Sequence, residues 1–179
     1  MTPDYQIITS TLTLRLITLD DAEPLLDCIM QSATLHQWVD WCHPDFSLDD
    51  TERFILATRL NWVKGQAYGF GVFCRESDEL LGMVAINELY HTFNMASIGY
   101  WVSDKHQGQG IGKKAVCALV EFCFDMLKLS RVEIVCDPDN VPSQRLIESC
   151  GGQFECQAPN RFIFRGKPKT GLVYAIIPQ

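Results

Sequence analysis

A cluster of glycines directly before an apolar-faced helix constrains this chain more than any other feature of its sequence. The segment HQGQGIGKKA (106–115) holds three glycines within five positions and then runs into two lysines. Glycine loses more conformational entropy on ordering than any other residue, so such a cluster is kept where a side chain would obstruct something. The apolar residues that follow recur at steps of three and four, which predicts a helix over 111–128.

Two known phosphate-binding motifs can be compared with this cluster. The dinucleotide fingerprint G-x-G-x-x-G fits at Gly108 and Gly110, but its third glycine position is Lys113, and the motif normally opens the first β-α unit. Asp137 lies where an acidic ribose partner would stand, so the spacing disfavours this motif without excluding it. A Walker loop is excluded, because both its first glycine and its hydroxyl residue are missing.

The position of the cluster still predicts an anion site. The first N–H groups of a helix have no partner within the helix and lie at the positive end of its dipole, which suits a diphosphate. Lys113 and Lys114 fall in the first helical turn, where positive charge is unfavourable unless an anion binds. A glycine-rich turn that only lets the strand and the helix pack closely is the other interpretation, and both stay open at this point.

The rest of the chain predicts one mixed α/β domain over 1–179. Alternating polar and apolar residues predict a strand at 11–17, and capping residues at Thr18 and Ser47 predict two helices after it. Three strands joined by short polar turns predict an antiparallel meander, at 68–75, 80–91 and 96–103. The helix 111–128 then crosses over to a further strand, and a short helix and two strands follow, at 131–137, 142–152, 153–156 and 171–177.

The second of these helices is expected to bury an apolar stripe made of Phe54, Ile55, Leu60 and Val63. The segment LHQWVDWCHPDF (35–46), between the two helices, is expected to be irregular. Its aromatic residues are expected either to wall a binding cleft or to seal the junction between the helices.

Composition excludes several classes of protein. A net charge of −7 argues against a general nucleic-acid binder, which would present a basic surface. No segment has the roughly 18 apolar residues of a membrane-spanning helix, and the N-terminus lacks the pattern of a signal peptide. The eight cysteines form no CxxC pair, so no metal or thiol-redox site is predicted, and buried thiols of a cytoplasmic protein are expected.

The glycine cluster and its neighbours resemble the GNAT acyltransferase superfamily, which binds acetyl coenzyme A. Residues 107–112 match its Q/R-x-x-G-x-G/A signature, and the preceding IGYWVSDK resembles a strand of the subgroup that acetylates ribosomal-protein N-termini. The stretches DNVPS, GGQF and TLTLRLITLDDAEPLL extend the resemblance over residues 10–156. It implies an α/β (α+β) GNAT fold, with a mixed, mostly antiparallel central sheet of six to seven strands and about four helices. The strands at 97–103 and 131–137 are expected to splay apart.

The resemblance also assigns a cofactor site. The pantetheine arm of acetyl coenzyme A is expected to bond into the gap between the splayed strands like an added strand, and the amides of 108–113 are expected to hold the diphosphate. Asn140 is expected to bond the pantetheine amide or, alternatively, to cap the helix after it. The residues implied to bind the cofactor are Tyr100, Trp101, Val102, Gln107, Gly108, Gln109, Gly110, Ile111, Gly112, Lys113, Asn140 and Ser143.

Catalysis needs an uncharged amine, a polarised thioester carbonyl and a protonated leaving thiolate. The resemblance implies a backbone N–H near Val102 as the oxyanion donor and Ser143 as the contact to the thiol. Glu88 is the first candidate for a base acting through water and His91 the second, while a solvent-facing glutamate and an exposed turn histidine are the alternatives. The tyrosine acid of many relatives is replaced here by Ile147, as is common in the ribosomal subgroup.

These features together predict an acetyl-CoA-dependent N-acetyltransferase acting on a protein N-terminal α-amine, as in the ribosomal-protein subgroup. The alternatives are a small-molecule amine (polyamine, amino acid or aminoglycoside) as acceptor, and a non-catalytic acyl-CoA-binding sensor. The segments 38–46 and 158–170 are expected to line the acceptor side, although the second lacks the acidic insertion usual in that subgroup. The prediction includes no direct nucleic-acid or membrane binding, and proteins of this family are often homodimers.

Overall fold

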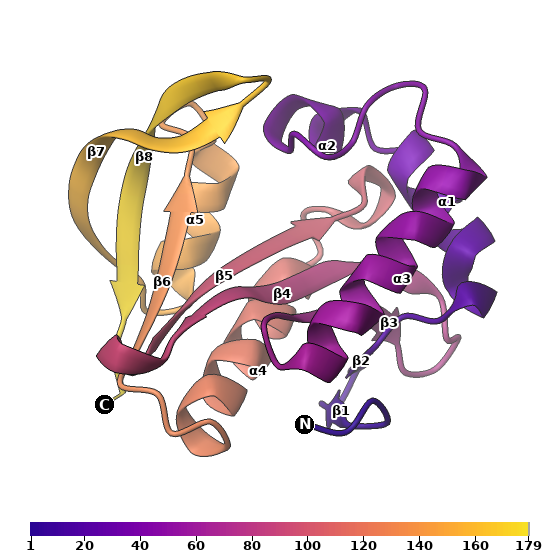
Figure 1. Ribbon diagram of the computed structural model, residues 1–179, viewed down its shortest axis with the longest axis horizontal. Coiled ribbons are helices and arrows are strands. Elements are labelled where there is room, and N and C mark those ends of the chain that lie inside the picture. Colours follow the sequence, from indigo (N-terminus) through magenta and orange to yellow (C-terminus); the bar gives the residue numbers. More distant parts are fainter. Residues whose placement is uncertain (179) are drawn as a thin grey trace.

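The computed structural model describes residues 1–178 and shows an open sheet with helices on both of its faces (Figure 1). Within these residues the eight strands are β1 (Gln6–Ile8), β2 (Leu12–Arg15), β3 (Tyr68–Cys74), β4 (Leu80–Tyr90), β5 (Met95–Val102), β6 (Arg131–Cys136), β7 (Gln153–Phe164) and β8 (Lys167–Ile176). The five α-helices of the same residues are α1 (Ala22–Met30), α2 (Ala33–Trp38), α3 (Leu48–Lys64), α4 (Ile111–Asp125) and α5 (Val141–Ser149). Across the sheet the strands follow the order β1-β2-β3-β4-β5-β6-β8-β7.

The predicted meander and the predicted crossover are both confirmed. β3, β4 and β5 pair antiparallel in sequence order, and β5 pairs parallel with β6 because α4 carries the chain back across the sheet. The mixed, mostly antiparallel sheet is therefore confirmed, with one strand and one helix more than predicted. β1 has three residues and α2 has six, lengths at which neither alternation nor helical periodicity can be read from the sequence.

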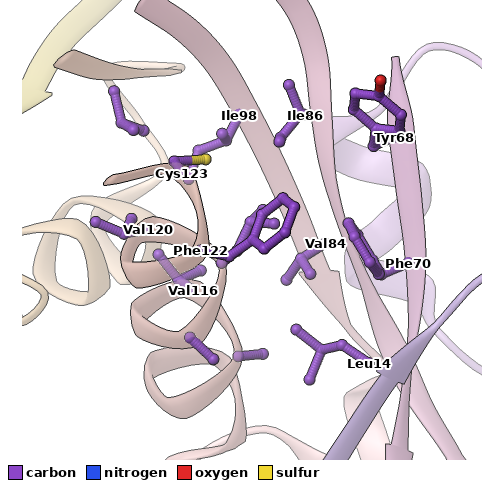
Figure 2. Packing of buried hydrophobic residues seen from close by; sticks show 14 of the residues in the cluster. Leu14, Tyr68, Phe70, Val84, Ile86, Ile98, Val116, Val120, Phe122 and Cys123 are labelled. Carbon is purple, nitrogen blue, oxygen red and sulfur yellow. The ribbon is translucent and has the colours of Figure 1, made fainter. Parts of the chain in front are cut away.

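Helix α4 lies against one face of the sheet and packs its apolar stripe there. Figure 2 shows Val116 and Phe122 of α4 facing Phe70 and Val84 of the central strands. The opposite face is covered by α1, α2 and α3, which enclose a second apolar cluster around Leu25, with β3 and β4. Because both faces of the sheet are buried, the central strands are apolar almost throughout.

The predicted apolar stripe of α3 is partly wrong. Leu60 and Val63 are 52% and 71% exposed, whereas Ile55 and Trp62 are buried. The Trp62 indole packs edge-on against Tyr68 and Phe70, and its Nε1–H donates to the Thr2 carbonyl at 3.2 Å. The large aromatic ring fixes the rotation of the helix, and the aliphatic residues beside it turn to solvent.

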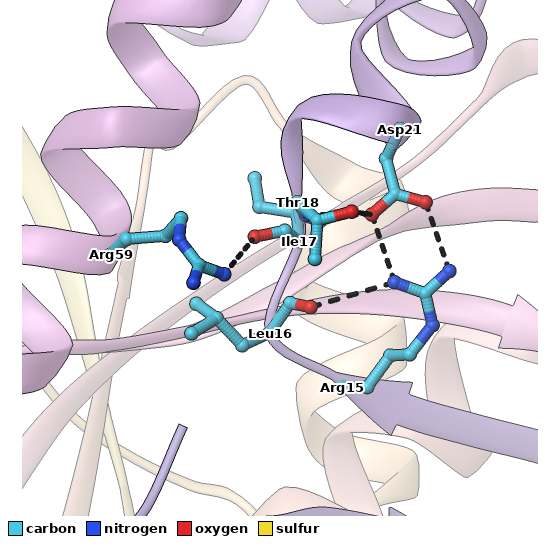
Figure 3. Close-up of polar contacts among 6 residues, drawn as sticks. All are labelled: Arg15, Leu16, Ile17, Thr18, Asp21 and Arg59. Carbon is cyan, nitrogen blue, oxygen red and sulfur yellow. Dashed lines mark hydrogen bonds and ion pairs between the residues drawn. The ribbon is translucent and has the colours of Figure 1, made fainter. Parts of the chain in front are cut away.

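An ion pair fixes the chain where β2 turns into α1 (Figure 3). The Arg15 guanidinium donates to both carboxylate oxygens of Asp21, at 2.8 and 2.9 Å, and the Thr18 N–H donates to the same carboxylate at 2.7 Å. Asp21 is buried, and burial raises the pKa of its carboxyl, but the hydrogen bonds from Arg15 and Thr18 outweigh burial and hold the pKa below its usual range. Thr18 thus caps the short 3-10 turn Leu19–Asp21 that leads into α1, with Asp21 as its capping-box partner, and the residue that precedes α1 itself is Asp21.

Replacing this carboxylate should destabilise the protein in a pH-dependent way. Asp21→Asn keeps an acceptor for the Thr18 N–H but removes the charge that pairs with Arg15, so the free energy of unfolding should fall by about 2 kcal/mol at neutral pH. The lowered pKa means that the ion pair stabilises the protein above the unfolded-state pKa of about 3.9 and that this stabilisation is lost as the pH falls through the folded-state pKa.

Urea denaturation of wild type and Asp21→Asn should therefore give a difference that shrinks below about pH 4. Asp20→Asn, an exposed change in the same turn, is the matched control and should have little effect. A destabilisation that is equal at pH 7 and pH 3 would contradict the role given to the Asp21 charge.

Candidate active site

β5 and β6 are paired at one end only and diverge at the other (Figure 1). Three residue pairs join them, which are Met95 with Arg131, Ala96 with Val132, and Ser97 with Glu133. Beyond Ser97 the strands separate, and a cleft of about 450 Å³ is lined by residues of both. The predicted splay between 97–103 and 131–137 is therefore confirmed.

The far half of β5 presents free backbone groups to this gap. The Ser103 N–H donates to the Leu81 carbonyl at 2.9 Å, so odd-numbered residues at this end of β5 face β4. Backbone groups alternate sides along a strand, so the N–H groups of Tyr100 and Val102 point toward the gap. The Trp101 N–H faces β4, and this predicted binding residue contributes its indole, which lines the cleft.

Tyr100 and Ser143 meet across the gap. The Tyr100 hydroxyl oxygen lies 2.8 Å from Ser143 Oγ and donates to the Ser143 carbonyl oxygen at 3.2 Å. Burial is the main cause that raises the pKa of Tyr100, so its hydroxyl stays protonated at neutral pH. The sequence reasoning gave Tyr100 only a backbone role, because the contact joins residues 43 positions apart.

The cleft also contains a thiol, at Cys136 on β6. Burial raises the pKa of Cys136 to about 11, so the thiol is neutral at physiological pH. It is therefore a poor nucleophile there and does not compete with an incoming amine.

Two of the three clustered glycines have backbones that other residues rarely adopt. Gly108 and Gly110 have φ angles of +72° and +75°, in the left-handed region. Gly110 is the N-cap of α4 and has no side chain that could cap the helix, and the first helical bond runs from the Lys114 N–H to the Gly110 carbonyl. The N–H groups of 111–113 are therefore left without helical acceptors at the positive end of the dipole, an arrangement that fits a diphosphate.

Gly112 has a different purpose from its neighbours. A Cβ at this position would lie 2.6 Å from Leu146 Cδ1 on α5 and 3.4 Å from Val102 Cγ2 on β5. The glycine lets α4 pack closely against both elements. The close-packing interpretation thus applies at Gly112, while the anion site at Gly108 and Gly110 stays a prediction. Ile111 also packs against the core, while Lys113 is exposed in the first turn of α4.

The predicted glutamines have their side chains engaged within the protein. Gln107 Nε2 lies within hydrogen-bond distance of the Val102 carbonyl (3.1 Å), Asp104 Oδ1 (3.1 Å) and Thr34 Oγ1 (3.0 Å). Gln107 thereby ties the glycine loop to the end of β5 and to α2, and any contact to a cofactor would come from its backbone. Gln109 donates to the Lys105 carbonyl at 3.2 Å and closes the loop on itself.

The structure brings Asn140 to the cleft, but not Glu88 or His91. Asn140 Oδ1 accepts the Ser143 N–H at 3.1 Å, so the helix-cap alternative applies to this oxygen. A bulge in β4 between Ile86 and Glu88 leaves Asn87 on the cleft wall, while Glu88 is exposed and bonds to the Tyr90 hydroxyl. His91 is exposed in the turn at the closed end of the β5–β6 pair.

The carboxylate that lines the cleft is Asp137, directly after β6. Its Oδ1 accepts the Asp139 N–H at 2.9 Å, which leaves the other oxygen free of protein partners among the described residues. In the sequence this residue was considered only as a mimic of a dinucleotide-binding acid. Its place at the end of the diverging strand was the signal that could have singled it out.

One wall of the cleft is aromatic. Trp41 stacks on Phe54, with ring centroids 4.8 Å apart, and lies 6.4 Å from the Trp101 ring. Trp38 completes this wall, and Phe162 of β7 stands across from it. Both 38–46 and 158–170 contribute residues to the cleft lining, and 158–170 is mostly strand, while the assignment of these segments to the acceptor stays a prediction.

Two features are absent from residues 1–178. No three side chains of His, Cys, Asp or Glu come close enough together there to hold a metal ion. None of the helices in that range combines the length and the apolar character needed to span a membrane.

Diverging parallel strands, with an uncapped helix N-terminus beside them, define an acyltransferase fold built to bind an acyl-coenzyme A. The sequence model described as "Acetyltransferase (GNAT) domain" matches residues 11–153, and the chain belongs to this family of acetyltransferases. The ribosomal-protein-serine acetyltransferase of Escherichia coli K12 is 30% identical over 158 residues, which cover 83% of this chain and 86% of that protein.

Two solved structures have the same fold over nearly their whole length. A proposed ribosomal-protein-serine acetyltransferase from Vibrio cholerae is 62% identical, with a TM-score of 0.93 over 99% of this chain and 100% of the other. The RimL ribosomal L7/L12 alpha-N-protein acetyltransferase, solved in complex with coenzyme A, is 25% identical, with a TM-score of 0.86 over 97% and 98%.

Adding a methyl group at the helix cap should impair the anion site without unfolding the protein. In Gly110→Ala the left-handed backbone is strained by about 1 kcal/mol, so the loop is expected to shift and misalign the amides of 111–113. Affinity for coenzyme A, measured by isothermal titration calorimetry, should fall by about tenfold or more.

The matched control is Gly65→Ala, at the end of α3. Gly65 has a similar φ of +68° but does not line the cleft, so this variant should bind coenzyme A as wild type does. Equal affinities for all three proteins would contradict the assignment of the diphosphate to this loop.

Proposed function

We propose that this acetyltransferase uses acetyl coenzyme A to acetylate the N-terminal α-amine of a ribosomal protein. The observation that carries the proposal is the open edge of β5, where two backbone N–H groups face the gap to β6 and Val102 packs beside Gly112 at the start of α4. The names of the E. coli and V. cholerae relatives support a ribosomal-protein acceptor. Because ribosomal proteins are made in the cytoplasm, this acceptor also implies action there.

The cofactor is held by the chain at two places. The Val102 N–H, beside the start of α4, bonds an extended pantetheine arm as it would bond a neighbouring strand, and the amides around Gly110 bind the diphosphate. The amide nitrogen of Asn140, whose oxygen caps α5, is free to add a further bond. Bound in this way, acetyl coenzyme A supplies an activated acetyl thioester.

The residues around the gap supply the polar groups for the transfer. The Tyr100 N–H, the next free N–H along the open edge from Val102 and farther from the glycine loop, donates to the acetyl carbonyl oxygen as negative charge develops on it. The Ser143 hydroxyl gives its proton to the leaving thiolate and regains one from solvent water, while the Tyr100 hydroxyl, 2.8 Å away, stays protonated and holds the serine in place. This pair takes the place of the tyrosine acid that the chain lacks at Ile147.

Asp137 is the carboxylate best placed to receive the proton that the amine loses, through a water molecule. It lines the cleft and has a free oxygen, whereas Glu88 is exposed and bonded to Tyr90. Within residues 1–178, Asp137 is the one carboxylate in the cleft lining, and this bears on which amine the cleft can accept. A polyamine carries several positive charges and needs several acids, whereas a protein N-terminus brings one reacting amine, so an aromatic cleft with one acid favours the protein.

Product analysis with two acceptors tests the proposed function. We expect the purified protein with acetyl coenzyme A to acetylate the α-amine of a peptide that begins with serine, and to leave spermidine unmodified. Mass spectrometry locates the added acetyl group, and the same peptide with a blocked N-terminus and an internal lysine is the control. Acetylation of spermidine alone would contradict the proposal, and tight coenzyme A binding without any product would favour the sensor alternative.

The identity of the base can be tested with a pair of isosteric variants. Asp137→Asn keeps the acceptor for the Asp139 N–H, so the turn is preserved, and kcat should fall by about 100-fold because no carboxylate takes the amine proton. Glu88→Gln should leave kcat and its pH dependence unchanged. A loss of activity in Glu88→Gln with normal turnover in Asp137→Asn would reverse this assignment.

A further inference from the structure

The β7–β8 hairpin carries the opposite charge from the rest of the chain. Residues 153–179 contain four basic residues and one acidic residue, a net charge of +3, so residues 1–152 carry −10 of the total of −7. The basic residues are Arg161, Arg165, Lys167 and Lys169. Such a local reversal marks this hairpin as the part of the molecule suited to an anionic partner.

Register places two of these residues on the cleft face of the hairpin. Phe162 of β7 lies directly opposite Lys169 of β8, and Phe164 lies directly opposite Lys167. Directly opposite residues of an antiparallel pair project to the same face, and residues two apart on one strand share that face. Because Phe162 lines the cleft, Lys169 stands on the cleft side level with it, and Lys167 stands on the same side two residues nearer the tip of the hairpin.

The tip of the hairpin is fixed against the opposite wall. The Arg165 N–H donates to Asp40 Oδ1 at 2.6 Å, and its guanidinium donates to the His36 carbonyl at 3.3 Å. Figure 1 shows the hairpin arching over toward α2. The two lysines are thus held at the rim of the cleft, on a hairpin anchored at its tip.

Among the described residues, these lysines have no acidic partner. Arg161 pairs with Glu133, and Arg131 with Glu155, but Lys167 and Lys169 take part in none of the ion pairs and both are exposed. Their charges are available to a molecule that enters the cleft.

We propose that Lys167 and Lys169 form a basic rim that binds an acidic segment of the acceptor protein, directly after the N-terminus that is acetylated. This inference rests on the proposed function, since it takes a protein N-terminus as the acceptor. The amine enters between the aromatic walls, and the chain that follows it leaves the cleft over the rim. RNA is the less suitable anion, because a chain of net charge −7 with two free rim lysines cannot neutralise many phosphates.

Charge-matched peptides test the basic rim. Two peptides share the same first three residues, beginning with serine, and continue with four glutamates in one and four glutamines in the other. For wild type at low salt, kcat/KM should be about tenfold higher for the glutamate peptide, because each exposed charge pair adds a modest amount to the binding free energy. The difference should lie in KM and not in kcat, because the rim binds the peptide away from the reacting amine. The preference should shrink in 0.5 M NaCl.

The double variant K167E/K169E should lose this preference or reverse it. The matched control is K64E/K128E, which changes the net charge equally at exposed positions that do not line the cleft and should keep the preference. Coenzyme A affinity should be unchanged in both variants.

Several outcomes would overturn the inference. Equal kcat/KM for the two peptides with wild type, or an unchanged preference in K167E/K169E, would refute the rim while leaving the proposed function in place. Failure to acetylate either peptide, with spermidine acetylated, would refute the proposed function and the rim together. Inhibition by a short RNA that exceeds inhibition by an acidic peptide with a blocked N-terminus would assign the rim to nucleic acid.

Discussion

The parallel pairing of β5 with β6 ends after three residue pairs, and the functional half of the molecule depends on where it ends. Each of the two strands keeps one complete partner beyond that point, since β4 accompanies β5 and β8 accompanies β6. The divergence therefore leaves one open edge on each strand while the sheet stays intact. A backbone N–H that is shielded from water is costly to leave without a hydrogen-bond acceptor. An extended ligand in the gap can supply acceptors for the N–H groups of Tyr100 and Val102.

The last joined pair also connects the cleft to the hairpin beyond it. Glu133, opposite Ser97, is buried and forms ion pairs with Arg131 of its own strand and Arg161 of β7. The same position thus ends the β5–β6 pairing and anchors the strand that carries Phe162 to the acceptor side. The gap between β5 and β6 and the position of Phe162 in the cleft therefore both depend on the Ser97–Glu133 pair.

Local patterns in the sequence were sufficient for the meander, the crossover helix and the glycine loop, because each depends on residues close together in the chain. The features that the sequence did not predict are contacts that no local pattern reports. Glu88 bonds to Tyr90 and does not line the cleft, Gln107 bonds to Thr34 across 73 positions, and the Trp62 ring sets the rotation of α3. The Tyr100–Ser143 contact and the cleft position of Asp137 likewise required the arrangement of strands in space.

We propose that the open edge of β5 and the N-terminus of α4 together receive the cofactor. Amide hydrogen exchange followed by NMR, with and without acetyl coenzyme A, measures this directly, residue by residue. Exchange at the amides of Tyr100, Val102 and 111–113 should become slower when the cofactor is added, with little change at Trp101 and Ser103, which face β4. Protection at other sites, with exchange at Tyr100 and Val102 unaltered, would contradict it.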